Sequence, residues 1–342
     1  MTRSFLYVPA DRPDRLVGAL ERGADAVIAD LEDGVAPAAK DEARRNTIEW
    51  LADAPAPGDG ARGPQRWARI NGDDRTIGDL DAVIHPNLSG LVLPKATLSR
   101  LSDLEETITY LEEDRGIEAL TTRINALIES ARGILDAIGL AAHHRVDRLA
   151  VGEADLTAEL GINPATGAHG LWPLRMQLVV ASAAAAIAAP VAPVQTDIAD
   201  VEHLRRTSEE LAAAGFGARS AIHPTQIPII NEVFAPSPDD VAWAEQLIAD
   251  FAARTDDGLG VFTDAAGSMV DEAVVRRARR IVAADAVAAR SALTLADLIG
   301  AIAAAVERVS AESGEPVTLA GHSLGGFLAR VAAEVCADRL AE

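Results

Sequence analysis

Charged and polar side chains follow apolar, strand-like runs at several points in the first 225 residues. Two of them are carboxylates: Glu129 closes the run Leu127-Ile128-Glu129, and Asp155 lies four residues beyond a run that ends at Val151. Mg²⁺ typically takes one or two protein carboxylates and leaves its other positions for water and substrate. Either carboxylate alone would more readily be a helix cap, but two at successive strand ends favour a metal. We therefore predict Glu129 and Asp155 as metal ligands.

Arg69 ends another apolar run, two residues before Asn71. Its guanidinium could bind a substrate carboxylate through two hydrogen bonds, or stabilise an oxyanion as charge develops. The alternative is an ion pair with Asp30 or Asp33, and the two roles are compatible. Glu32 and Asp33, at the end of the second run, could be partners for Arg69 or for metal-bound water. We predict Arg69, Glu32 and Asp33 as catalytic residues.

Lys40 and Lys95 are the two lysines of a chain that has 29 arginines. Lys95 directly follows an apolar run, where a compact ammonium has different uses from a guanidinium. It could position an anion, or it could form an imine with a keto substrate. Lys40 belongs with Arg3 and Arg44 to a group of cations early in the chain, which could hold an anionic small molecule or could be solvated surface charges. We predict Arg3, Lys40, Arg44 and Lys95 as cofactor-binding residues.

The elements that must position these side chains alternate between strands and helices. The expected strands are Ser4–Val8, Ala26–Leu31, Trp67–Ile70, Gly90–Leu93, Ile124–Ile128, Asp147–Val151, Val191–Gln195 and Arg219–Ile222. Apolar residues at three-to-four spacing predict helices between them, at Arg12–Arg22, Lys40–Leu51, Leu98–Glu113, Arg132–His143, Pro173–Ala189 and Val201–Ala214. This is the sequence form of an α/β fold, a (β/α)8 TIM barrel. The carboxyl ends of barrel strands converge, so the candidate residues would share one site.

The barrel is expected over residues 1–235, because Pro236-Ser237-Pro238 interrupts the alternation. Residues 236–290 contain two helical patterns around a glycine-rich segment, and Met269-Val270-Asp271 opens the second. We predict a helical lid, which would exclude water from the site. In residues 291–342, Gly321 to Gly326 resembles the nucleophile elbow of an α/β-hydrolase, but no histidine follows Ser323. This extension is interpreted as an incomplete hydrolase-like fragment.

Composition excludes several classes of partner. The formal net charge of −21 would repel nucleic acid and anionic membranes. The most apolar stretch, Val179–Val194, is interrupted by two prolines and is too short to span a bilayer. Cys336 is the single cysteine, so neither an intrachain disulfide nor a cysteine-based metal cluster is expected. We expect a cytoplasmic protein.

Eight short motifs occur in order over residues 1 to about 288. They are Arg3-Ser4-Phe5-Leu6-Tyr7-Val8-Pro9, Gly23–Asp33, Lys40 with Ala43-Arg44, Arg69-Ile70-Asn71-Gly72, Leu93-Pro94-Lys95, Ile128-Glu129, Gly152 with Asp155-Leu156, and Ile222-His223-Pro224-Thr225-Gln226. In this combination the chain resembles the citrate lyase β-subunit-like, malyl-CoA and citramalyl-CoA lyase branch of the HpcH/HpaI aldolase/citrate lyase superfamily. One departure is Gly18, where the family often carries a lysine expected to contact the CoA phosphates.

The resemblance implies a Mg²⁺-dependent lyase that acts on a 3-hydroxyacyl-CoA such as malyl-CoA, citramalyl-CoA or citryl-CoA. The products would be an acetyl-CoA-type thioester and a 2-oxo acid. The family's metal-ligand pair falls on Glu129 and Asp155, and its substrate arginine falls on Arg69. It also implies that Asp271, on the lid, serves as acid/base in a neighbouring subunit's site, within a homotrimer or a trimer-based hexamer.

Three alternatives stay open. Lys95 at a strand end could make the protein a class I aldolase that works through a Schiff base. The same metal and pocket could direct water at the thioester, which would make it an acyl-CoA thioesterase. The chain could also be a carrier-dependent subunit of the citrate lyase type, acting within a complex on an acyl-carrier-bound substrate.

Overall fold

The computed structural model describes residues 2–53, 63–256, 261–263 and 267–292. They form two compact units, one over Thr2–Ala235 and one that begins at Pro236. The predicted hydrolase-like motif at Gly321 to Gly326, and the rest of the predicted extension from 293 onward, lie outside the described residues.

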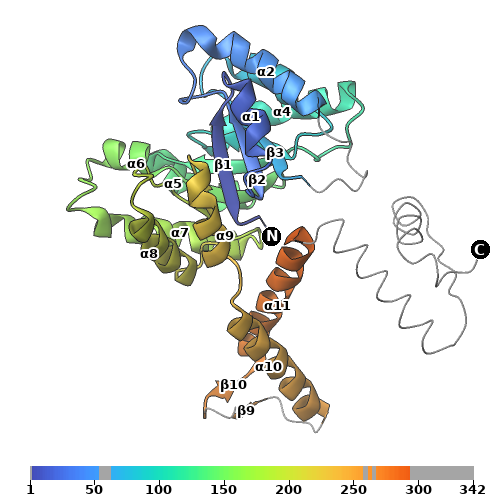
Figure 1. Cartoon of the computed structure of the whole chain (residues 1–342), viewed down its shortest axis with the longest axis vertical. Helices are drawn as coiled ribbons and strands as arrows, with labels where there is room; N and C mark the ends of the chain where they lie inside the picture. The colour runs from blue at the N-terminus through green and yellow to red at the C-terminus, as the bar shows by residue number, and fades with distance from the viewer. Residues whose placement is uncertain (1, 54–62, 257–260, 264–266, 293–342) are drawn as a thin grey trace, which may run out of the picture. The chain divides into compact units, whose positions relative to one another are not determined.

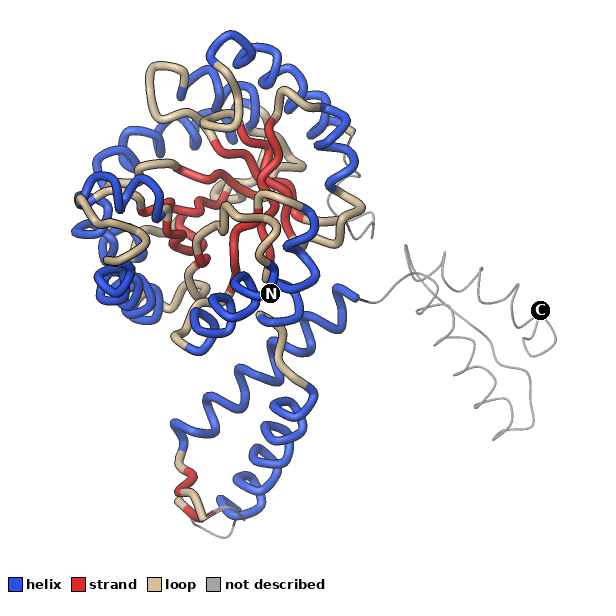
Figure 2. Tube along the Cα trace, turned by 60° about the vertical axis from the view of Figure 1, so that its left-hand side comes forward, coloured by secondary structure: helices blue, strands red, loops and turns tan. Residues whose placement is uncertain are grey.

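Within the first unit, eight parallel strands close into a barrel in chain order, which confirms the predicted (β/α)8 fold. Figure 2 shows the strands, in red, enclosed by helices, in blue. Each strand pairs with the next, and β8 pairs back to β1 through Arg219 and Ser4. The strands are β1 Ser4–Pro9, β2 Ala26–Asp30, β3 Gln65–Arg69, β4 Gly90–Leu93, β5 Arg123–Ile128, β6 Val146–Val151, β7 Val191–Ala192 and β8 Ala218–Ala221.

The barrel interior is filled by one face of the strands, because successive side chains of a strand point to opposite sides. Phe5, Ile28 and Trp67 belong to this inner cluster, and the rings of Phe5 and Trp67 meet edge to face at 5.8 Å. Gly90 leaves room for Trp67: a Cβ there would lie 2.5 Å from the indole ring. The other face of the strands packs on the helices in a larger apolar cluster.

The helices of the first unit surround the barrel, and Figure 1 labels most of them. Thr97, Ser130 and Asp200 cap α4, α5 and α8, each accepting a hydrogen bond from a first-turn N–H. The sequence patterns missed α3, α6 and α9, which have seven or eight residues each. The helices are α1 Pro13–Ala19, α2 Lys40–Ala52, α3 Thr76–Val83, α4 Leu98–Asp114, α5 Ala131–Ala141, α6 Glu153–Leu160, α7 Leu171–Ala184, α8 Val201–Ala213 and α9 Ile227–Val233.

The second unit is a helical hairpin with a short two-stranded sheet. Helices α10, Pro238–Asp256, and α11, Glu272–Ala292, lie side by side (Figure 1) and bury Ala244, Leu247 and Val275 between them. Strands β9, Phe262–Thr263, and β10, Met269–Val270, pair antiparallel. Among the described helices of both units, none is long and apolar enough to cross a membrane.

Candidate active site at the carboxyl ends of the strands

Arg69, at the end of β3, is held by Asp30, at the end of β2. Arg69 Nε and Nη2 donate to the two Asp30 carboxylate oxygens at 2.7 Å each, and the side chains are 13% and 5% exposed. Burial alone would lower the pKa of Arg69, but the hydrogen bonds and charge of Asp30 outweigh burial and raise it. The guanidinium is therefore charged and fixed in direction. A bidentate Arg–carboxylate pair also restricts its orientation.

Asp30 is itself fixed by the turn that follows β2. Its two oxygens accept the backbone N–H groups of Glu32 at 3.0 Å and Gly34 at 2.9 Å. A Cβ on Gly34 would lie 2.4 Å from Asp30 Oδ2, so a side chain at this position would displace the carboxylate. Lys40 Nζ donates to the carbonyl oxygens of Leu31 and Glu32 at 2.7 and 2.6 Å, which ties α2 to the same turn.

Glu32 extends from this turn toward Arg69. Its Oε2 forms an ion pair with Arg69 Nη1 at 2.9 Å, yet this buried oxygen accepts no hydrogen bond from the described residues. Burial raises the pKa of Glu32 to about 7 although Arg69 opposes the shift, and the carboxylates of Asp33, Glu129 and Asp30 raise it further. Glu32 can therefore exchange a proton near neutral pH. Asp33 is peripheral, because its side chain is 75% exposed and lies 3.8 Å from Arg69.

Glu129 follows β5 and is buried. Its Oε1 accepts the backbone N–H of Lys95 at 2.7 Å, and Lys95 adopts a left-handed backbone with φ of 45°. A Cβ on Gly152 would lie 2.6 Å from Glu129 Oε2, so the glycine after β6 makes space for this carboxylate. Burial raises the pKa of Glu129 to about 7, and the charge of Asp155 in the first turn of α6 adds to the rise.

These residues fit a divalent cation. The charge of Asp155 helps to raise the pKa of Glu129, and a bound cation between the two carboxylates would reverse that effect. The orphaned Oε2 of Glu32 would suit a donor such as a metal-bound water. An all-oxygen set of this kind matches the preference of Mg²⁺.

Tyr7 and Arg100 belong to this site although the sequence analysis did not single them out. The guanidinium of Arg69 lies over the Tyr7 ring, 5.1 Å from its centroid. Arg100 lies against Gly72, where a Cβ would be 3.0 Å from its Nη1. Burial lowers the pKa of Arg100, while the charges of Glu32 and Glu129 favour its protonated form. Tyr7 could have been found from strand alternation, since it lies two residues after the inward-facing Phe5.

Other candidates lie elsewhere. Arg3 precedes β1, at the opposite end of the barrel strands, where its guanidinium binds both oxygens of Asp25 at 2.9 Å. Arg44 binds Asp79 at 2.7 Å, between α2 and α3. Asp271 lies in the second unit, where its Oδ1 accepts the N–H groups of Ala273 and Val274 as the cap of α11.

The fold and the site define a (β/α)8-barrel enzyme with buried carboxylates and a fixed arginine at the carboxyl ends of its strands. Residues 3–224 match the model of the HpcH/HpaI aldolase/citrate lyase family. The chain belongs to this family, as the sequence motifs predicted.

Two curated relatives and one solved structure illustrate the match. The citrate lyase subunit beta of Leuconostoc mesenteroides subsp. cremoris is 32% identical over 286 residues, which are 82% of this chain and 92% of the relative. The (3S)-malyl-CoA thioesterase of Cereibacter sphaeroides is 33% identical, over 84% and 96% of the two chains. The CitE protein of Mycobacterium tuberculosis, solved with magnesium, acetoacetate and coenzyme A, superposes with a TM-score of 0.65 at 30% identity, covering 83% of this chain and 98% of that one.

Proposed function

We propose that this chain is a Mg²⁺-dependent carbon–carbon lyase. Its substrate would be a 3-hydroxyacyl-CoA such as malyl-CoA, citramalyl-CoA or citryl-CoA, cleaved into an acetyl-CoA-type thioester and a 2-oxo acid, or formed from them. The observation that carries the proposal is the guanidinium of Arg69, which is 13% exposed and is fixed by Asp30 near the carboxylates of Glu32 and Glu129. The relative named as a citrate lyase subunit supports the lyase reaction, and the malyl-CoA thioesterase supports the class of substrate.

Glu129 and Asp155 would hold the metal. When bound, Mg²⁺ supplies Lewis-acid polarisation of the oxo-acid oxygens and a template for the substrate. Glu129 can be presented to it because Lys95 N–H orients one of its oxygens and Gly152 leaves space beside the other.

Arg69 would offset negative charge on the oxygen of the oxo-acid half. Asp30 already holds Nε and Nη2, so Nη1 is the nitrogen left to the substrate side, where Glu32 meets it in this structure. A substrate oxygen would take a place beside Glu32. Because the guanidinium is oriented in advance, little reorganisation is needed as charge develops.

We assign proton transfer to two carboxyl groups. Glu32, with its pKa raised to about 7 mainly by burial, would hold or accept a proton beside Arg69. Asp271 is proposed as the acid/base for the thioester carbon, reaching a neighbouring subunit. Its capping bonds use Oδ1, and no described residue donates to Oδ2.

Of the cations predicted to bind CoA, Lys95 is the one with an exposed side chain beside Glu129. We propose that Lys95 binds the thioester or phosphate part of CoA. Lys40 and Arg44 would act indirectly, because each is already bound within the protein. We further propose that the protein is a cytoplasmic homotrimer or trimer-based hexamer. Light scattering in solution would measure the mass of the oligomer.

The test is oxo-acid release from malyl-CoA and citramalyl-CoA by metal-stripped protein, before and after addition of Mg²⁺, with free thiol measured in parallel. A lyase releases oxo acid without thiol. Thiol release alone would identify the second candidate, a thioesterase, which the malyl-CoA thioesterase relative favours. Activity with an acyl-carrier substrate only would indicate a carrier-dependent subunit, and borohydride trapping of Lys95 by a keto acid would indicate a class I aldolase.

A further inference from the structure

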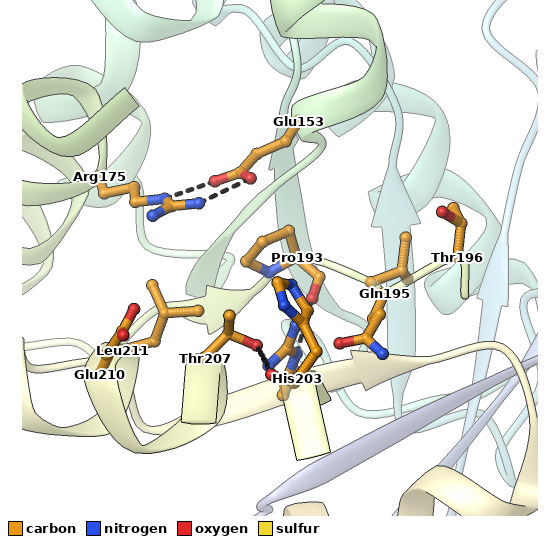
Figure 3. A pocket seen from close by; sticks show the side chains of 11 residues that line it. Glu153, Arg175, Pro193, Gln195, Thr196, His203, Thr207, Glu210 and Leu211 are labelled. Atoms are coloured by element: carbon orange, nitrogen blue, oxygen red, sulfur yellow. Dashed lines mark hydrogen bonds and ion pairs between the residues drawn. The ribbon is translucent and has the colours of Figure 1, made fainter. Parts of the chain in front are cut away.

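A cavity of about 230 Å³ lies beside the barrel, between the carboxyl ends of β6 and β7 and helices α7 and α8 (Figure 3). Its walls come from the start of α6, from α7 and α8, from the segment after β7 and from β8. One ordered water needs only ~10–15 Å³ on this kind of measure, so there is room for a small molecule.

One wall of the cavity contains Arg219 of β8, a buried arginine that is 3% exposed. Nε donates to the carbonyl oxygen of Pro193 at 3.0 Å, while Nη1 donates to the hydroxyls of Thr207 at 2.9 Å and Ser208 at 2.7 Å and to the carbonyl of Leu204 at 3.2 Å. These acceptors are all neutral. Among the described residues, no carboxylate forms an ion pair with Arg219, and nothing accepts a hydrogen bond from Nη2.

The guanidinium is nevertheless charged. Burial lowers the pKa of Arg219 to about 10, and that value still leaves it protonated at neutral pH. A buried charge without a counter-ion is costly, since neutral acceptors do not replace the lost solvation completely.

The carboxylates in the cavity wall are already paired with other arginines. Glu153 binds Arg175 through two hydrogen bonds of 2.6 and 2.8 Å, drawn as dashed lines in Figure 3. Glu210 binds Arg206 at 2.7 Å, one turn earlier on α8. His203 contacts the same Arg206 through Nδ1. The charge of Arg219 is therefore the unbalanced one in this wall.

Gln195, which follows β7, adds an unsatisfied acceptor. Its Nε2 donates to the carbonyl oxygens of Asp197 and Asp200 at 2.7 Å each, and these two bonds fix the orientation of the amide. Oε1 is buried and accepts no hydrogen bond from the residues that the structure describes. The side chain is one of those that line the cavity (Figure 3).

We propose that this cavity is a binding site for a small organic carboxylate that also carries a hydroxyl group. The carboxylate would accept from Arg219 and balance its charge, and the hydroxyl would donate to Gln195 Oε1. Both requirements come from groups that the protein leaves unsatisfied. The proposed contacts use neither Glu129 nor Asp155, while Glu153 of the cavity wall lies two residues before Asp155 in α6.

The first test compares Thr207→Glu with Thr207→Gln. Thr207 lines the cavity and touches Arg219, so the glutamate places a carboxylate where the ligand would bind, while glutamine has the same length without charge. Glycolate binding to the metal-stripped full-length chain is followed by calorimetry and by the unfolding midpoint, and is repeated with Mg²⁺. We expect saturable binding to the wild type and to Thr207→Gln, with or without metal. Thr207→Glu should bind at least about tenfold more weakly, as for one lost charge-assisted hydrogen bond.

A second variant tests the hydroxyl and does not depend on how α8 tolerates substitution. Acetate lacks the donor for Gln195, so the wild type should prefer glycolate to acetate, and Gln195→Leu should lose that preference. The proposal is overturned if the wild type shows no saturable binding, if Thr207→Glu binds as well as Thr207→Gln, if Gln195→Leu keeps the preference, or if binding requires Mg²⁺, which would assign it to the metal site.

Discussion

Asp30 binds Arg69 through both carboxylate oxygens, and the turn after β2 holds Asp30 in place. The sequence predicted this ion pair as one of two roles for Arg69, and the structure is compatible with both, because Nη1 faces Glu32. The sequence could not predict which guanidinium nitrogens bind Asp30 and which one faces Glu32. That assignment depends on the conformation of the turn after β2, which requires glycine at position 34.

The pair Asp30 and Asp33 offers a matched test of orientation. Asp30→Asn should lower kcat/KM by ~10–100-fold, because Arg69 loses its bidentate partner while the substrate-facing group remains. Asp33→Asn should change it little, since Asp33 is 75% exposed and 3.8 Å away. Steady-state kinetics with both variants measure this. Equal effects of the two substitutions would contradict the role given to Asp30.

The raised pKa values of Glu129 and Glu32, both about 7, predict how the metal-free protein responds to pH. Between their ordinary value of 4.5 and about 7, the folded chain binds more protons at these groups than the unfolded chain. The contribution of these two groups to the free energy of unfolding is therefore present at low pH and is lost as pH rises through about 7. The free energy of unfolding should fall by up to ~1.4 kcal/mol per pH unit for each proton released.

Denaturant unfolding of the metal-free chain across this range measures the slope, and Glu129→Gln should flatten it. Mg²⁺ should oppose the loss, with an apparent affinity that rises with pH until Glu129 is deprotonated. An unchanged slope in Glu129→Gln would show that Glu129 is not the titrating group.

Among the secondary-structure elements, the barrel strands determine which residues lie close together, because their carboxyl ends form one site. Each expected strand was found, with boundaries within three residues, because strand and helix patterns alternate clearly along the chain. The carboxyl ends of the barrel strands converge, and for this reason Arg69, Glu129 and Asp155 could be predicted to share one site. Arg3 stands before its strand rather than after it, and so lies at the far end of the barrel from them. The position of Arg3 before its predicted strand was already visible in the sequence.

Other contacts could not be predicted in this way. Lys40 is the first residue of α2, but the sequence does not reveal that its Nζ binds two backbone carbonyls of the preceding turn. Arg219 was recognised only as part of a strand, and its unbalanced charge depends on how α8 packs against β8. Side-chain partners of this kind follow from tertiary packing.

Gly152, at the junction of β6 and α6, leaves space for the Glu129 carboxylate, and this predicts the effect of a side chain there. Gly152→Ala should weaken Mg²⁺ binding by at least about tenfold, because the new Cβ would lie 2.6 Å from Glu129 Oε2. Backbone strain is not the cause, since φ of Gly152 is −104°. Gly18→Ala is the control: nothing lies within 4 Å, and alanine inside α1 should stabilise the fold by ~0.5–1 kcal/mol. Unchanged metal affinity in Gly152→Ala, measured by calorimetry, would refute the steric argument.

At the scale of the whole molecule, the proposed assembly predicts complementation. Glu129 and Asp271 belong to different units, and we propose that each site combines them from two subunits. Asp271→Asn keeps a capping side chain, so it should lose activity but keep its unfolding midpoint. Co-expression of Asp271→Asn with Glu129→Gln should then restore activity at about a quarter of the sites, if each site draws on two subunits of a ring. No recovery in mixed oligomers would mean that both residues act within one subunit, whereas an active Asp271→Asn variant would mean that Asp271 is not catalytic.

The most direct test of the central claim is to follow ¹³C-labelled citramalyl-CoA by NMR with the wild-type protein, with and without Mg²⁺, and with Glu129→Gln. We expect pyruvate and acetyl-CoA in equal amounts, only with Mg²⁺ and only in the wild type. Citramalate with free CoA would contradict carbon–carbon cleavage and favour thioester hydrolysis, and full activity of Glu129→Gln would contradict the metal site.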